Sequence, residues 1–178
     1  MSRMLERDRT TLVVVDVQEA FRTAVGEFDA VARGAAVLVQ GARALDVPVI
    51  ATEQYPKGLG ATVPEVGEHL DGVEPLSKTA FSACRAKGFH LGRRDQALVC
   101  GIEAHVCVSQ TAHDLLERGV QVHVAADAVT SRTAANRRLG LRKMEDSGAI
   151  LTSVETALFE LLGEAGTPEF KTIQTLIK

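Results

Sequence analysis

Three residues in the sequence have side chains that together could carry out covalent acyl transfer. Cys107 stands just past the apolar run "QALVCG", at the start of a stretch with helical spacing, whereas Asp16 and Lys78 end the runs "TLVVVD" and "VEPLSK". A cysteine nucleophile needs a group that accepts its proton, and a carboxylate kept ionised by a lysine can do so. The positive end of the helix dipole would also favour the thiolate of Cys107.

Each of these residues also has an ordinary structural interpretation. An aspartate after a strand is often the N-cap of the next helix, and a lysine at a strand end is usually a solvated charge. A cysteine in an apolar segment is most often a small buried hydrophobic residue, and we interpret Cys84 and Cys100 in this way. The combination of Asp16, Lys78 and Cys107, rather than any one of them, favours a catalytic site.

Short apolar runs, separated by segments with helical spacing, must position these residues. The runs are continuous rather than alternating, which is typical of strands covered on both faces of a parallel sheet. Helical spacing marks 28–45, 106–116 and 134–144. The runs cover 11–16, 47–52, 73–78, 96–101, 120–127 and 148–153. The alternation predicts an α/β fold, with a doubly wound sheet of six mostly parallel strands between helices on both faces, in three layers.

The predicted sheet brings the candidate residues to one edge. In open parallel sheets, ligands bind beyond the carboxyl ends of the strands, where the strand order reverses, and Asp16, Lys78 and Cys107 would all lie there. The turn 101–107 leads backbone N–H groups into the helix, and these could form an oxyanion hole that includes the amide of Cys107. The loop 53–59 is the expected substrate lid. We expect the pocket to be lined by Gln18, Gln54, Tyr55 and Phe81.

Composition and charge narrow the class of protein. The length of 178 residues favours a single domain over 1–178. The net charge is −3 with both signs interspersed, which argues against a nucleic-acid partner. The N-terminal run "LVVV" is too short for a signal peptide or a membrane span. Three cysteines without CxxC spacing suit a reducing compartment, so we expect a cytoplasmic protein.

Three motifs, in order along the chain, resemble those of the isochorismatase-like cysteine hydrolases. They are "VVVDVQEAF", "KTAFSA" and "VCGIEAHVCVSQTAHDLLERGVQVHVAADAVTSR", and the likeness covers nearly the whole chain. The segments "TEQYPKGLGATVPE" and "PEFKTIQTLIK" also resemble the subgroup of isochorismatase domain-containing proteins. The resemblance implies a catalytic triad of Asp16, Lys78 and Cys107 on a six-stranded parallel sheet. It further implies a cis peptide between Ile102 and Glu103, which aims the amides of Glu103 and Cys107 at the substrate, and a homo-oligomer, either a dimer or a larger assembly.

Two departures from the family pattern shape the expected reaction. Nicotinamidases of this family bind a metal through an Asp/His cluster, whereas "TEQYPKGLG" has no histidine, so we expect no metal and no other cofactor. Cleavage of the isochorismate ether needs no thiol, so Cys107 argues against it. We therefore expect a metal-independent cysteine hydrolase of a small amide, imide or related acyl compound, acting through a thioester. The alternatives are an ether hydrolase that uses Asp16 and Lys78, and a non-catalytic binding or assembly protein of the same fold.

Overall fold

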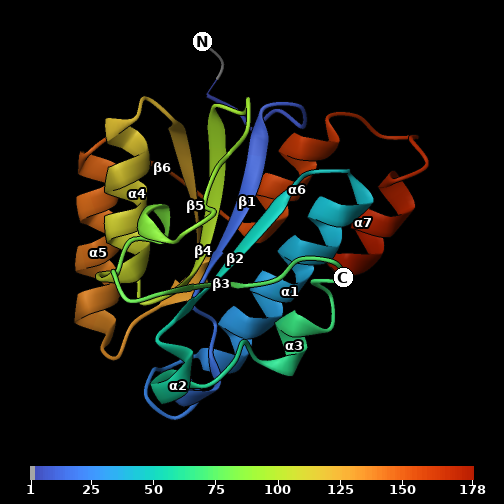
Figure 1. Cartoon of the computed structure of the whole chain (residues 1–178). Helices are drawn as coiled ribbons and strands as arrows, with labels where there is room; N and C mark the ends of the chain where they lie inside the picture. Colours follow the sequence, from blue (N-terminus) through green and yellow to red (C-terminus); the bar gives the residue numbers. More distant parts are fainter. Residues whose placement is uncertain (1–2) are drawn as a thin grey trace.

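Parallel strands form a single six-stranded sheet through the middle of the protein (Figure 1). The computed structural model describes residues 3–178. The strand order is β3-β2-β1-β4-β5-β6, and every neighbouring pair is parallel. The strands are β1 (Thr10–Val15), β2 (Val49–Gln54), β3 (Leu76–Lys78), β4 (Gln96–Ile102), β5 (Gln121–Thr130) and β6 (Ile150–Thr152).

Helices cover both faces of this sheet and complete the three layers. One face carries α1, α3, α6 and α7, and the other carries α4 and α5 (Figure 1). The helices are α1 (Phe28–Ala44), α2 (Pro56–Leu59), α3 (Pro64–Gly67), α4 (Cys107–Glu117), α5 (Ala134–Asp146), α6 (Val154–Leu162) and α7 (Phe170–Leu176), with 3₁₀ turns at Glu19–Phe21 and Ala83–Arg85. The predicted α/β fold is confirmed. The helices α2 and α3 were not predicted, because four residues are too few to show a helical period.

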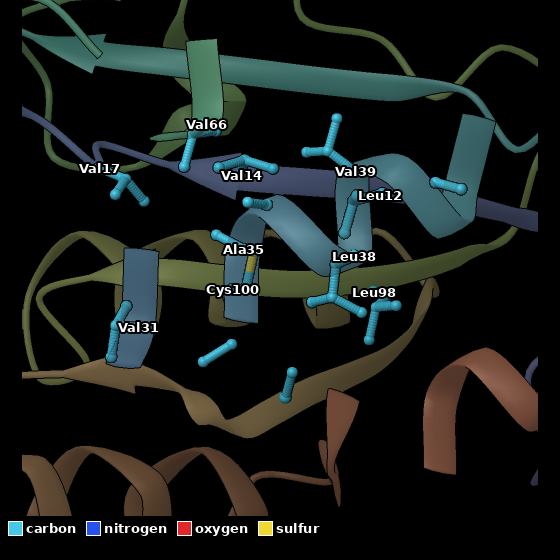
Figure 2. Packing of buried hydrophobic residues seen from close by; sticks show 14 of the residues in the cluster. Leu12, Val14, Val17, Val31, Ala35, Leu38, Val39, Val66, Leu98 and Cys100 are labelled. Atoms are coloured by element: carbon cyan, nitrogen blue, oxygen red, sulfur yellow. The ribbon is translucent and has the colours of Figure 1, made fainter. Parts of the chain in front are cut away.

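The core consists of two clusters of buried apolar side chains, one on each face of the sheet. Ala35 and Leu38 of α1 pack near Leu12, Val14 and Cys100 of the sheet (Figure 2). The interpretation of Cys100 as a buried hydrophobic residue is confirmed, and burial raises the pKa of its thiol to about 12. Val, Leu and Ala thus fill the space between sheet and helices, as the low aromatic content requires.

The strand order reverses between β1 and β4. The chain first builds outwards from β1 to β2 and β3, and then returns so that β4 pairs with the other side of β1. Gly101 makes a close approach possible at the end of β4, because its φ is +122° and a Cβ there would lie 2.0 Å from the carbonyl oxygen of Val15. The carboxyl ends of β1 and β4 therefore meet at the position where this fold class binds ligands.

We expect the buried His123 of β5 to lower the free energy of unfolding in acid. Its Nε2 lies 2.9 Å from Nε2 of Gln121, and within residues 3–178 its Nδ1 has no hydrogen-bond partner. Burial, with a smaller contribution from Arg3, lowers the pKa of His123 to about 4. The folded protein therefore binds this proton less tightly than the unfolded chain, so the stabilisation is complete above about pH 6.5 and is lost as the pH falls towards 4.

We expect His123→Leu to reduce the acid sensitivity of folding. The histidine accounts for a loss of roughly 3 kcal/mol between pH 7.5 and 4.5, if its pKa is about 4 when folded and 6.5 when unfolded. Urea denaturation of both proteins at the two pH values measures the difference. An equal loss of unfolding free energy in the variant would show that His123 titrates normally.

Candidate active site

Asp16, Lys78 and Cys107 lie at the carboxyl edge of the sheet, each delivered by a different element. Asp16 directly follows β1, Lys78 is the last residue of β3, and Cys107 is the first residue of α4. All three are buried, with at most 5% of each residue exposed. In the described residues, no helix is long and apolar enough to cross a membrane, and no three His, Cys, Asp or Glu side chains gather as a metal site would need.

Asp16 and Lys78 form a buried ion pair. Nζ of Lys78 donates to Oδ2 of Asp16 at 2.7 Å, and the hydroxyl of Thr52 donates to Oδ1 at 2.8 Å. Asp16 has a positive φ of 51°, a conformation that aspartate and asparagine tolerate better than most residues. Both carboxylate oxygens therefore have a fixed donor, which orients the group.

The ammonium of Lys78 is held by acceptors on three sides. Besides Asp16, Nζ donates to Oε1 of Gln54 at 2.7 Å and to the carbonyl oxygen of Phe81 at 2.8 Å. A weaker contact reaches the carbonyl oxygen of Ala80 at 3.3 Å. An ammonium has three donor hydrogens, so these bonds use all of them and fix Nζ beside Asp16.

Cys107 rests as a thiol, which corrects the expectation from the helix dipole. Burial and, to a smaller extent, the nearby Asp16 carboxylate raise the pKa of Cys107 to about 12, although Lys78 lowers it. Because a thiolate would face the Asp16 charge in a dry site, the helix N-terminus does not make the thiolate the resting form. The Asp16 carboxylate therefore acts on the thiol of Cys107 in the same buried site.

The turn between β4 and α4 is fixed to the end of β5. The peptide bond between Ile102 and Glu103 is cis. Oε2 of Glu103 accepts the backbone N–H of Arg132 at 2.9 Å and its Nε at 3.1 Å, and the N–H of Ala104 donates to the carbonyl oxygen of Thr130 at 2.8 Å. Between residues 3 and 178, the amides of Glu103 and Cys107 have no hydrogen-bond acceptor.

The four expected pocket residues have two kinds of environment. Gln18 is buried: its Nε2 donates to the carbonyl oxygens of Gln54 (3.0 Å) and Gly60 (2.7 Å), and its Oε1 accepts the N–H of Gln54 (2.8 Å). Gln54 is occupied with Lys78, and its Nε2 donates to the carbonyl of Thr79 at 2.8 Å. The side-chain amides of Gln18 and Gln54 are therefore used in hydrogen bonds between the segments that surround the site.

Two aromatic side chains, those of Tyr55 and Phe81, face solvent. Tyr55 is 55% exposed and Phe81 is 51% exposed. Both belong to segments that position Lys78, because Tyr55 follows Gln54 and the backbone carbonyl of Phe81 itself accepts from Nζ. Of the four expected residues, these two have side chains with area left for contact with another molecule.

Sequence reasoning missed Thr52 and Arg132. Thr52 ends the predicted strand 47–52, and its importance depends on the register that sets it opposite Val15, next to Asp16. Arg132 follows β5, and its bond to Glu103 joins segments about thirty residues apart. A strand register was the one signal that could have found Thr52, and nothing local pointed to Arg132.

The amino-acid sequence of the chain matches a known protein-family model. Residues 10–156 match the isochorismatase domain model, and this range includes every candidate residue. The chain belongs to the isochorismatase family. The match confirms the resemblance seen in the motifs, and it identifies the protein as a hydrolase of this family.

Known members of the isochorismatase family resemble the chain over nearly its full length. Human isochorismatase domain-containing protein 2 is 46% identical over 172 residues, which are 95% of this chain and 83% of the relative. The secreted isochorismatase effector Isc1 of Phytophthora sojae is 44% identical, covering 95% of this chain and 84% of the relative. A structure described as MAR1 ribonuclease from Caenorhabditis elegans superposes with a TM-score of 0.91 at 41% identity, covering 98% of this chain and 92% of that chain.

Proposed function

We propose that this protein is a metal-independent cysteine hydrolase that cleaves a small amide, imide or related acyl compound through a thioester on Cys107. The observation that carries the proposal is the buried ion pair of Asp16 and Lys78, whose two charges both act on the buried thiol of Cys107. This arrangement supplies a nucleophile, a proton acceptor and a fixed charge at one position.

The first half of the proposed reaction forms the thioester. Sγ of Cys107 bonds to the carbonyl carbon while its proton moves to the Asp16 carboxylate. The carbonyl oxygen becomes an oxyanion, to which the free amides of Glu103 and Cys107 donate. The C–N bond then breaks, and Asp16 returns the proton to the departing nitrogen, so the amine leaves and the acyl group stays on sulfur.

The second half releases the acid. Water attacks the thioester carbonyl carbon as Asp16 takes a proton from the water, and the C–S bond breaks. The proton then returns to Sγ, and the thiol is restored. Throughout both halves Nζ of Lys78 stays bonded to Asp16, Gln54 and the carbonyl of Phe81, so its positive charge lies next to the carboxylate that exchanges the proton.

The test combines a substrate panel with detection of the acyl-enzyme. The purified protein is incubated with small primary amides, cyclic imides, isochorismate and an RNA oligonucleotide, and the peptide containing Cys107 is examined by mass spectrometry after rapid acid quenching. We expect turnover of an amide or imide and a mass increase equal to the acyl group on Cys107, with Cys84 and Cys100 unmodified. Turnover without such an adduct in single-turnover conditions would contradict the thioester.

The panel also separates the competing functions. Cleavage of isochorismate that survives loss of the thiol would favour the ether hydrolase, and binding of panel compounds without turnover would favour the non-catalytic protein. RNA is included because a related structure is described as a ribonuclease. We expect no RNA cleavage, because the net charge is −3 and the cation of the site, Lys78, is buried against Asp16.

We place the enzyme in the cytoplasm because all three of its cysteines are free and buried. Fractionation of the source cells tests this location.

We propose a homo-oligomer in which a second copy covers Tyr55 and Phe81, which are exposed beside the site. Sedimentation of Tyr55→Ser and Phe81→Ser variants tests it: the variants should dissociate at concentrations where the wild type does not.

The Glu103 carboxylate gives a further prediction about positioning. Glu103→Leu should lower kcat about 10- to 100-fold with little change in KM, because the turn that presents the amides loses its bonds to Arg132. Glu103→Gln keeps an acceptor for the backbone N–H of Arg132 and should recover most of the rate. Equal rates for the two variants would show that the carboxylate does not position the turn.

A further inference from the structure

The connection that follows β3 supplies two of the acceptors that hold Lys78. Nζ of Lys78 donates to the carbonyl oxygen of Phe81 at 2.8 Å, with a weaker contact to that of Ala80 at 3.3 Å. Across residues 79–95, all of which the structure describes, the one regular element is the 3₁₀ turn Ala83–Arg85. The position of the two carbonyl oxygens therefore depends on what this connection packs against.

The 3₁₀ turn packs against α4, the helix that begins with Cys107. In Figure 1 the turn is drawn in green beside α4. The N–H of Ala83, at the start of the turn, donates to Oγ1 of Thr111 on α4 at 2.8 Å. Two further bonds across this contact are 3.3 Å long and lie nearer the surface: Nη2 of Arg118 to the carbonyl oxygen of Cys84, and Nε of Arg85 to Oδ2 of Asp114. The bond to Thr111 is therefore shorter and more deeply buried than these two.

The hydroxyl of Thr111 is also bonded to the backbone of the candidate nucleophile. Its Oγ1 donates to the carbonyl oxygen of Cys107, one helical turn earlier, at 2.7 Å. A hydroxyl has one donor hydrogen and two acceptor lone pairs, so it can donate to Cys107 and accept from Ala83 at the same time. Thr111 and Ala83 are both 0% exposed, so solvent does not compete for either bond.

These bonds join Lys78 to Cys107 by a route that does not pass through Asp16. The connection that holds Nζ of Lys78 is bonded to Thr111, and Thr111 is bonded to Cys107. In the proposed reaction the Asp16 carboxylate gains and loses a proton, which changes the strength of its bond to the ammonium. The hydroxyl and the backbone groups bonded to it stay neutral, so their bonds can persist through the whole cycle.

Building on the thioester mechanism, we propose that Thr111 is a positioning residue, whose hydroxyl fixes the ammonium of Lys78 relative to the sulfur of Cys107. A purely structural bond would only satisfy the buried N–H of Ala83, and its loss would lower the stability of the protein alone. Loss of a positioning bond also lowers the rate in protein that is still folded. A misplacement of about 1 Å can slow a reaction roughly a hundredfold.

The test replaces the hydroxyl while keeping the shape of the side chain. In Thr111→Val, we expect kcat for the best amide or imide substrate to fall about tenfold or more, with KM changed less than about twofold. Thr111→Ser keeps both bonds and should retain kcat within about threefold. If the valine variant does not fold, Thr111→Ala removes the same two bonds with a better helix former and carries the same expectation.

Thr10→Val is the matched control for stability. Thr10 is also 0% exposed, and its Oγ1 lies 2.8 Å from the carbonyl oxygen of Glu6 and 2.9 Å from Oε1 of Gln96. Its loss should lower the urea midpoint, as Thr111→Val does, but kcat should stay within about twofold because Thr10 begins β1 and Asp16 follows its end. Equal kcat in the two valine variants overturns the proposal. So does a loss in Thr111→Ser as large as that in Thr111→Val.

A second measurement needs no substrate and separates this proposal from the proposed function. The rate at which iodoacetamide alkylates Cys107 is followed at pH 8 in the wild type and in both valine variants. Lys78 lowers the pKa of Cys107, so a less firmly held Lys78 should slow alkylation about threefold or more in Thr111→Val, but not in Thr10→Val. If this difference is found and no amide or imide is turned over, the proposed function fails and the positioning by Thr111 stands. An unchanged alkylation rate in Thr111→Val overturns the positioning.

Discussion

Replacing Cys107 with serine should lower turnover of the amide or imide substrate by roughly a thousandfold or more. A serine hydroxyl is a far weaker acid than a thiol, so Asp16 would have to take a proton that a carboxylate removes poorly. The side chains are similar in size, and residue 107 is held by the α4 backbone, so the fold should be kept. The measurement is kcat for the best substrate in the panel, with the circular dichroism spectrum of both proteins compared.

The matched control for this variant is Cys84→Ser. Cys84 is also buried and also has a pKa raised by burial, but it lies on the 3₁₀ turn before β4, outside the contact of Asp16 with Lys78. It should keep activity within about twofold, since no reacting group touches it. Full activity of Cys107→Ser would contradict the thioester mechanism and favour the ether hydrolase.

Replacing Asp16 with asparagine should lower both the turnover of the substrate and the pKa of Cys107. Turnover should fall about 10²- to 10⁴-fold, because the proton acceptor is lost. The pKa of Cys107 should fall from about 12, because the Asp16 carboxylate raises it both by its charge and by its hydrogen bond, whereas Lys78 remains and lowers it. Iodoacetamide should therefore alkylate Cys107 with a lower pH midpoint in Asp16→Asn than in the wild type.

The asparagine variant is suited to this test. Asparagine tolerates the positive φ at residue 16, and its amide oxygen can still accept a bond from Lys78. Asp114→Asn on α4 is the control, because that carboxylate pairs with the exposed Arg85; it should leave both turnover and alkylation unchanged. An alkylation midpoint in Asp16→Asn equal to or above that of the wild type would contradict the proposed effect of Asp16 on the Cys107 thiol.

The fold could be predicted from the sequence because the relevant signals are local. The continuous apolar run of β4 indicates a strand buried on both faces, and the helical spacing after Cys107 indicates α4. Edge strands are harder to delimit: the predicted strand 73–78 begins in the structure only at Leu76, since β3 pairs on one side alone. Strand β5 extends to Thr130, past the predicted end at 127.

The candidate site could be predicted only as far as the sheet edge. Strand ends show that Asp16 and Lys78 lie at the same edge, but not that Thr52 and Gln54 would bond to them, because those contacts depend on register. The protonation state of Cys107 depends on burial and on neighbouring charge, which act through space. Local spacing therefore identifies the reactive residues, and the surrounding bonds decide how they behave.

The short strand β3 should make the site unfold locally more easily than the rest of the protein. It has three residues, pairs only with β2, and ends in Lys78, whereas β1 and β4 are flanked by strands on both sides. Edge strands open locally at a lower free energy than central ones. The enzyme should therefore become inactive at denaturant concentrations where most of the chain is still folded, and the amides of β3 should exchange with solvent deuterium before those of β1 and β4.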